Sequence, residues 1–166
     1  MKSPRPYYLL LFAVCVSLLG FGYYLQFVDG LEPCPLCIFQ RLAYIAVAIT
    51  ALFGFIHAPQ NYWIRLYSGL ISVTAIGGAG IAGRQVWLQH LPADKVPECG
   101  PGLDYMLQVL PLTDTLKRVF TGSGECAQID WTFLSLSIAE WSLLCFVGLA
   151  AASIIHFMTG RLAGGT

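Results

Sequence analysis

The residues most suited to chemistry are two cysteines, Cys34 and Cys37, in the stretch EPCPLCIFQR. A disulfide between cysteines two residues apart closes so small a ring that it constrains little chain, and this spacing is a common redox device. Pro35 favours a helix start between them, which places Cys37 in or near the first helical turn. The unpaired N–H groups and positive dipole at that turn favour a thiolate. The motif therefore predicts a redox-active pair.

Arg41 follows Cys37 by four residues, one turn along the same face of the predicted helix. A guanidinium close to lipid is costly without an anionic partner or a polar ligand. Two interpretations stay open. In the first, Arg41 is functional and stabilises a Cys37 thiolate or polarises a bound electron acceptor. In the second, its side chain only extends to the lipid headgroups.

Cys99 and Cys126 complete a set of four cysteines outside the apolar stretches of the chain. Four cysteines allow three pairings and three uses: static disulfides, a zinc site or exchanging redox pairs. Zinc is disfavoured because Cys99 and Cys126 are too far apart to form a second knuckle. A static bridge between them would tie down a long loop but would leave the Cys34–Cys37 spacing poorly explained.

The elements that must position these residues are transmembrane helices. Of the 166 residues, 57% are hydrophobic and 11% are charged, with a mean hydropathy of +0.68, whereas soluble domains have about 25% charged residues. Zero net charge gives no support to nucleic-acid binding. Backbone groups in lipid must be satisfied internally, which requires helices. We expect one all-α membrane domain over 1–166, a four-helix transmembrane bundle with spans at about 8–27, 39–57, 66–86 and 141–158.

The loops at about 28–38 and 87–140 are expected on one side of the membrane. Apolar residues at helical spacing in 103–110 and 112–120 predict short helices on the membrane surface or against the top of the bundle. The positive residues before the first span put both termini in the cytoplasm and the four cysteines outside it, where disulfides persist. A cleaved signal peptide is the alternative for the first span, but no small-x-small cleavage pattern follows it.

Within the spans, the run GGAGIAG at 77–83 predicts close approach of a neighbouring helix. Cys15 and Cys145 fall in the middle of the first and last spans, where thiols most often act as small hydrophobic side chains. We therefore assign these three features to packing.

The chain resembles the DsbB family of membrane thiol oxidases. The resemblance covers almost the whole chain: four spans, CPLCIFQR opening the second, and a cysteine pair in the long loop. It also rests on AGRQVWLQ at 82–89 and GECAQIDWTFLSLSIAEWSLL at 124–144. It implies a bacterial inner-membrane protein with periplasmic redox cysteines, which reoxidises a DsbA-like thiol oxidase and passes the electrons to ubiquinone or menaquinone.

The resemblance also implies roles for individual residues. Cys99 and Cys126 would form the disulfide that DsbA reduces, with Cys99 the site of the mixed disulfide. Cys126 would then exchange with Cys34 and leave Cys37 as a thiolate against the quinone ring, beside Arg41.

Gln85 stands where some members of the family have a histidine. Its amide can hydrogen-bond a quinone carbonyl but cannot supply a proton as an imidazolium can, so Gln85 is expected to line the quinone pocket only. His90 is too far along the helix to take its place.

The alternatives to a thiol oxidase of this family are a quinone reductase of the vitamin K epoxide reductase kind and a non-catalytic four-span protein with structural disulfides.

Overall fold

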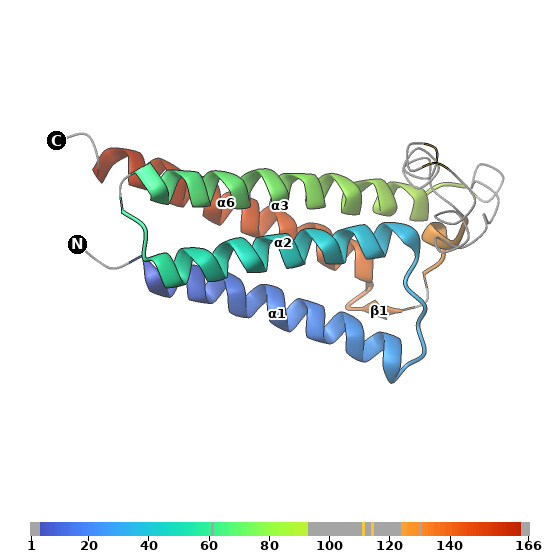
Figure 1. The fold of residues 1–166 in the computed structure, drawn as a ribbon. Helices are drawn as coiled ribbons and strands as arrows, with labels where there is room; N and C mark the ends of the chain where they lie inside the picture. Colours follow the sequence, from blue (N-terminus) through green and yellow to red (C-terminus); the bar gives the residue numbers. More distant parts are fainter. Residues whose placement is uncertain are drawn as a thin grey trace.

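The computed structural model describes residues 4–60, 62–92, 111, 114, 124–129 and 131–163, with side chains as far as residue 159. Its long helices form a bundle (Figure 1). Each is long and apolar enough to cross a membrane, so the predicted all-α, four-helix membrane bundle is confirmed. The bounds of these helices are α1 (Arg5–Phe27), α2 (Pro35–His57), α3 (Tyr62–Gln89) and α6 (Ile138–Ala163).

The helices extend beyond the apolar stretches that predicted them, most clearly at the starts of α2 and α3 and at the end of α6. A count of apolar residues locates the part of a helix that lies in lipid. Backbone hydrogen bonds continue the helix until a cap or a loop ends it. The start of α2 at Pro35 agrees with the helix start expected from that proline.

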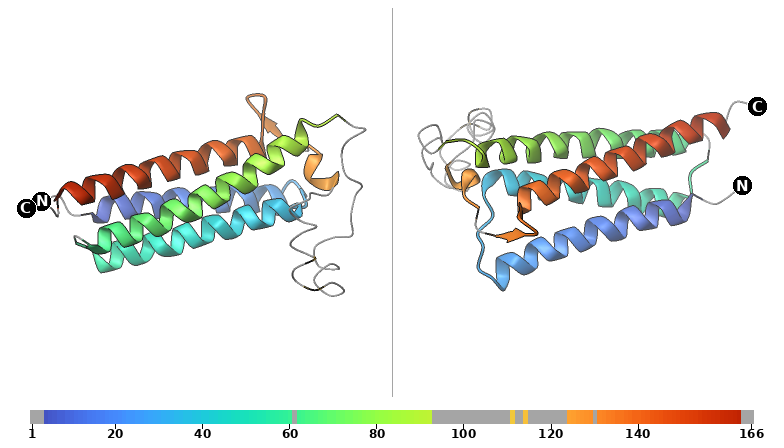
Figure 2. Two further views of the ribbon diagram at one scale, coloured as in Figure 1. Left: turned by 90° about the horizontal axis from the view of Figure 1, so that it is seen from above. Right: turned by 180° about the vertical axis from the view of Figure 1, so that it is seen from behind.

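Helix α1 packs against α2, α2 against α3, and α3 against α6. Helix α1 begins and α6 ends at one end of the bundle (Figures 1 and 2). The opposite end holds the start of α2, the end of α3, the short 3₁₀ helix η2 (Gly124–Ala127) and the start of α6. We call this opposite end the cysteine end, because Cys34, Cys37 and Cys126 belong to it.

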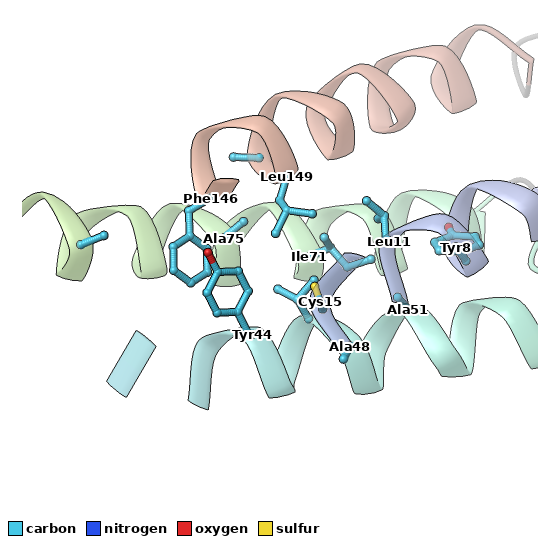
Figure 3. Packing of buried hydrophobic residues seen from close by; sticks show 13 residues of the cluster. Tyr8, Leu11, Cys15, Tyr44, Ala48, Ala51, Ile71, Ala75, Phe146 and Leu149 are labelled. Carbon is cyan, nitrogen blue, oxygen red and sulfur yellow. The ribbon is translucent and has the colours of Figure 1, made fainter. Parts of the chain in front are cut away.

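The bundle core contains side chains from all four helices (Figure 3). The Tyr44 ring of α2 stacks on Phe146 of α6 with ring centroids 4.0 Å apart, and the Tyr44 hydroxyl donates to the Ser142 carbonyl oxygen at 3.2 Å. Cys15 is fully buried in this core, and Cys145 packs against it half-buried. Both thiols therefore contribute to packing, as expected from their positions in the spans.

Two glycines allow helices to approach closely. A Cβ on Gly78 of α3 would overlap the Phe146 ring, and a Cβ on Gly54 of α2 would lie 2.8 Å from the Tyr8 ring of α1. The close approach predicted for the 77–83 segment is confirmed at Gly78.

An unpredicted hairpin precedes α6. Strand β1 (Thr132–Phe133) pairs antiparallel with β2 (Leu136–Ser137), and Leu134 and Ser135 form the turn between them with φ of 51° and 65°. Ser137 and Glu140 then cap α6 reciprocally: the Ser137 N–H donates to Glu140 Oε2 at 2.7 Å and the Glu140 N–H to Ser137 Oγ at 3.3 Å. The predicted surface helices fall outside the described residues, apart from Asp114.

Candidate functional site

Cys34 and Cys37 form a pair of thiols at the mouth of α2. Cys34 is the N-cap, in extended conformation, and its Sγ accepts a hydrogen bond from the Cys37 N–H at 3.4 Å. Cys37 lies in the first turn, as the proline between them predicted. The two Sγ atoms are 3.0 Å apart in their thiol form. Two-electron oxidation by an acceptor could therefore close a disulfide here with only a small approach of the sulfur atoms.

Cys126 lies beside this pair although it comes from a distant part of the chain. It is 1% exposed and forms a buried cluster with Leu36 of α2 and Leu88 of α3, against which Cys34 packs. A hydrogen bond to Cys126, a second one to Cys37 and burial together raise the pKa of the Cys34 thiol well above its usual value. Of the four predicted redox cysteines, the structure thus brings together three; Cys99 lies outside the described residues.

Gln85 of α3 faces the thiol pair from the neighbouring helix. Its Nε2 lies 3.2 Å from Cys37 Sγ and 3.5 Å from Cys34 Sγ. Its Oε1 accepts a hydrogen bond from Gln40 Nε2 at 2.7 Å. Both glutamines are buried, and Gln85 is in direct contact with the sulfur atoms of Cys34 and Cys37.

Gln40 is a site residue that the sequence analysis did not identify. It follows Cys37 by three residues, which puts it on the same face of α2. A neutral polar side chain at that spacing in an otherwise apolar helix was the available signal, since a buried amide needs a hydrogen-bond partner.

Arg41 points to the other neighbour of α2. Its Nη1 donates to Gln26 Oε1 and its Nη2 to the Gly22 carbonyl oxygen at 3.0 Å. The guanidinium also lies over the Tyr23 ring, 4.8 Å from its centroid. Arg41 therefore finds its polar ligands on α1, one helical turn below Cys37, and these bonds use two of its five N–H donors.

His90 lies on the α6 side of the cysteine end. Its Nδ1 is 2.9 Å from the Val86 carbonyl oxygen and its Nε2 is 3.8 Å from Glu140 Oε1. The side chain is 65% exposed. His90 thus contacts the start of α6, and its role stays a prediction.

The arrangement suits thiol–disulfide exchange. In such a reaction a thiolate attacks one sulfur of a disulfide and the other sulfur leaves as a thiolate. Here a third thiol, Cys126, is in place to attack Cys34, and the amide of Gln85 donates toward Cys37, the sulfur that would leave.

Comparison with known proteins points to the same chemistry. The family model described as "Disulfide bond formation protein DsbB" matches residues 4–156. A Disulfide bond formation protein B from Methylococcus capsulatus is 52% identical over 157 residues, 95% of this chain and 96% of the relative. A Disulfide bond formation protein B from Azoarcus sp. is 49% identical over 160 residues, which cover 96% of this chain and 95% of the relative. Disulfide bond formation protein B 1 of Pseudomonas aeruginosa is 46% identical over 158 residues, which cover 95% of this chain and 97% of the relative. With its thiol cluster at the mouth of a transmembrane helix, this multi-pass membrane chain belongs to the DsbB family of disulfide bond formation proteins.

Proposed function

We propose that this protein is a dithiol:quinone oxidoreductase that reoxidises a periplasmic thiol oxidase of DsbA type and passes the two electrons to a membrane quinone. The observation that carries this proposal is the contact of Cys126, from the loop region, with a Cys-x-x-Cys pair at the mouth of a membrane span. Such a contact links a thiol from a segment outside the spans to a thiol pair at the start of a span. A static set of structural bridges has no need of it.

The transfer begins with three disulfide exchanges. A thiolate of the partner attacks Cys99 in a Cys99–Cys126 disulfide, and the electron pair leaves on Cys126. The Cys126 thiolate attacks Cys34 Sγ, which forms a Cys34–Cys126 bond, breaks the Cys34–Cys37 bond and leaves the electron pair on Cys37. The second partner thiol resolves the first mixed disulfide and releases oxidised partner. Each of these exchanges conserves the number of disulfides. Cys99 then attacks Cys126, which restores the Cys99–Cys126 bond and releases Cys34 as a thiolate. Cys34 and Cys37 finally give two electrons to the quinone as the Cys34–Cys37 bond forms again.

A quinone, ubiquinone or menaquinone, takes up two electrons and two protons as it becomes the hydroquinone. Arg41 fits a quinone carbonyl oxygen because its guanidinium is held one turn from Cys37 and retains donor capacity beyond its bonds to α1. Gln85 would line the same region from α3, through an amide that already reaches Cys37. Arg41 and Gln85 are thus the proposed quinone-binding side chains.

The energetics favour such an acceptor. A DsbA-type oxidase has a reduction potential of about −120 mV, and each ~30 mV of uphill two-electron transfer costs about 1.4 kcal/mol. The terminal acceptor must therefore have a higher potential than the partner. A lipid-soluble acceptor also explains why the Cys-x-x-Cys pair opens a membrane span.

We place the protein in the bacterial inner membrane with both termini in the cytoplasm and the cysteine end in the periplasm. Two observations support this orientation. Lys2 and Arg5 precede the first span, and α1 begins at the end of the bundle opposite the thiols (Figure 1).

The decisive experiment is anaerobic reoxidation of a purified DsbA-type dithiol by the purified protein, with and without added quinone. We expect one oxidised partner per quinone reduced, and no turnover without quinone. Cys34→Ser should abolish the reaction, whereas the matched control Cys145→Ser, within the bundle, should leave it intact. Turnover by a variant lacking both Cys34 and Cys37, or independence from quinone, would refute the proposal.

A further inference from the structure

Two buried amides, Gln40 of α2 and Gln85 of α3, form a hydrogen-bonded chain that ends on the sulfur atoms of the thiol pair. Gln40 Nε2 donates to Gln85 Oε1 at 2.7 Å, and Gln85 Nε2 lies 3.2 Å from Cys37 Sγ. Gln40 is 5% exposed and Gln85 is 4% exposed. Water therefore competes little with these contacts.

The bond from Gln40 determines which end of the Gln85 amide faces the sulfur atoms. An amide carries a carbonyl acceptor at one end and an NH₂ donor at the other. Because the carbonyl oxygen of Gln85 accepts from Gln40 at 2.7 Å, its NH₂ group makes the shorter contact with Cys37 Sγ, at 3.2 Å, and lies 3.5 Å from Cys34 Sγ. The carbonyl oxygen lies farther from Cys37 Sγ, at 3.5 Å, where it can accept a bond from the protonated thiol. The reverse orientation would oppose two NH₂ groups at the Gln40 contact.

The orientation matters for a sulfur that carries negative charge. A hydrogen bond to an ionised group is about twice as strong as one between neutral groups. An NH₂ group therefore stabilises a thiolate at Cys37, whereas a carbonyl oxygen in the same place would repel it. In a dry site such as this one the difference is larger than in water.

We propose that Gln40 is a positioning residue, which holds the Gln85 amide with its NH₂ group toward Cys37 and so stabilises the thiolate left there when the Cys34–Cys37 bond opens. In that step the electron pair of the broken bond goes to Cys37 Sγ, while Cys34 Sγ bonds to the attacking Cys126 sulfur. The catalytic relevance rests on the function proposed above. The thiolate stabilisation itself needs neither partner nor quinone.

The test measures the reactivity of Cys37 in the reduced full-length protein, in detergent micelles at pH 7. Iodoacetamide reacts with the thiolate, and mass spectrometry of the labelled peptide gives the rate at Cys37 alone. We use Gln→Met substitutions, which keep the length and volume of the side chain and remove its hydrogen bonds. The set is Gln40→Met, Gln85→Met, the double variant, and Gln60→Met as a matched control in the exposed connection between α2 and α3, at the end of the bundle opposite the thiols.

Gln85→Met should slow alkylation of Cys37 roughly tenfold, the scale of one hydrogen bond to a charged group. Gln40→Met should slow it severalfold, because the Gln85 amide would no longer be held with its NH₂ group toward Cys37. The double variant should match Gln85→Met, because Gln40 acts through Gln85 and the two effects are not additive. Gln60→Met should react as wild type, since Gln60 is exposed and lies at the end of the bundle opposite the thiols.

Other outcomes overturn the proposal. If Gln40 and Gln85 only pack around Cys37, the Gln→Met substitutions would leave the alkylation rate of Cys37 unchanged or, by exposing its sulfur, raise it. Additive losses in the double variant would show that Gln40 acts independently of Gln85. Because no partner or quinone is present, failure here is distinct from failure of the proposed function, which would appear as absent quinone-dependent turnover in the wild type.

Discussion

Neighbouring groups give the sulfur atoms at the mouth of α2 different properties. Cys34 donates toward other sulfurs, which keeps its proton in place and raises its pKa. Cys37 receives an amide NH₂ group from Gln85. The Cys-x-x-Cys spacing and Pro35 predicted the pair and its place in the first helical turn. The glutamine contacts could not be predicted, because they depend on which face α3 turns to α2.

The raised pKa of Cys34 can be tested through the pH dependence of its alkylation rate. Cys126→Ala removes the acceptor that contributes most to holding the Cys34 proton, so the pKa of Cys34 should fall toward the ordinary thiol value of about 8.5. In the reduced wild type, alkylation of Cys34 should stay slow through pH 9, and in the variant its rate should rise at lower pH. Peptide mass spectrometry across pH 7–10 gives both profiles.

The control for this pH profile is Cys145→Ala, which removes a thiol within the bundle and should leave the profile of Cys34 unchanged. Identical profiles for Cys126→Ala and wild type would contradict the assigned hydrogen bond.

Arg41 gives a second prediction at the residue scale. If its guanidinium holds a quinone carbonyl oxygen, Arg41→Ala should raise the KM for quinone tenfold or more, the effect of about 1.4 kcal/mol. The KM for the protein partner should not change. Steady-state kinetics with each substrate varied in turn separate the two. Arg65→Ala, which removes a cation–π contact to Phe157 in another part of the bundle, serves as the control; equal quinone kinetics in both variants would make Arg41 a structural anchor to α1.

At the scale of elements, the helices are held by a few close contacts and by their caps. Gly78 lets α3 approach the Phe146 ring of α6, and Gly54 lets α2 approach Tyr8 of α1. The glycine run predicted the first contact, since small residues allow transmembrane helices to pack closely. The hairpin before α6 was not predicted because its strands have two residues each, too few to show an alternating pattern.

Neighbouring glycines test the packing of α3 on α6. A Cβ at Gly78 would overlap Phe146, whereas one at Gly77 has no neighbour within 4 Å among the described residues. Gly78→Ala should therefore cost about 1–3 kcal/mol through overpacking and lower the melting temperature in detergent. Gly77→Ala should leave it unchanged or raise it, because alanine favours helix. Circular dichroism during heating gives the melting temperatures. Equal values for the two variants would show that α3 and α6 do not approach as described.

At the scale of the whole molecule, the bundle gathers thiols from two distant segments at one end. The 3₁₀ helix η2 is held there by Leu88 beside Cys126 and by a hydrogen bond from Gln89 Nε2 to the Gln128 carbonyl oxygen at 3.5 Å. Helix α3 thus provides both the support for η2 and the amide that faces the sulfurs. This arrangement brings Cys126 of η2 into contact with Cys34, the N-cap of α2, as the proposed exchange requires.

The arrangement predicts a specific cross-link. In a Cys37→Ser, Cys99→Ser variant, mild oxidation should join Cys34 to Cys126 within one chain, because their side chains are in contact. Non-reducing mass spectrometry identifies the linked peptides. Cys145, separated along α6 from the cysteine end, should stay unlinked under the same conditions. Failure to form the bridge, or bridges only between chains, would contradict the placement of η2.

The sequence by itself determined the class of the molecule, its helices and the kind of chemistry. Lipid leaves the backbone no alternative to internal hydrogen bonds, and a proline between two cysteines marks a helix start at a redox motif. The tertiary structure decided the partners: Cys126 beside Cys34, Gln40 behind Gln85, and Arg41 on α1. Helices that are apolar on every side carry no strong pattern to indicate which face meets which neighbour, so only their packing brings these side chains together.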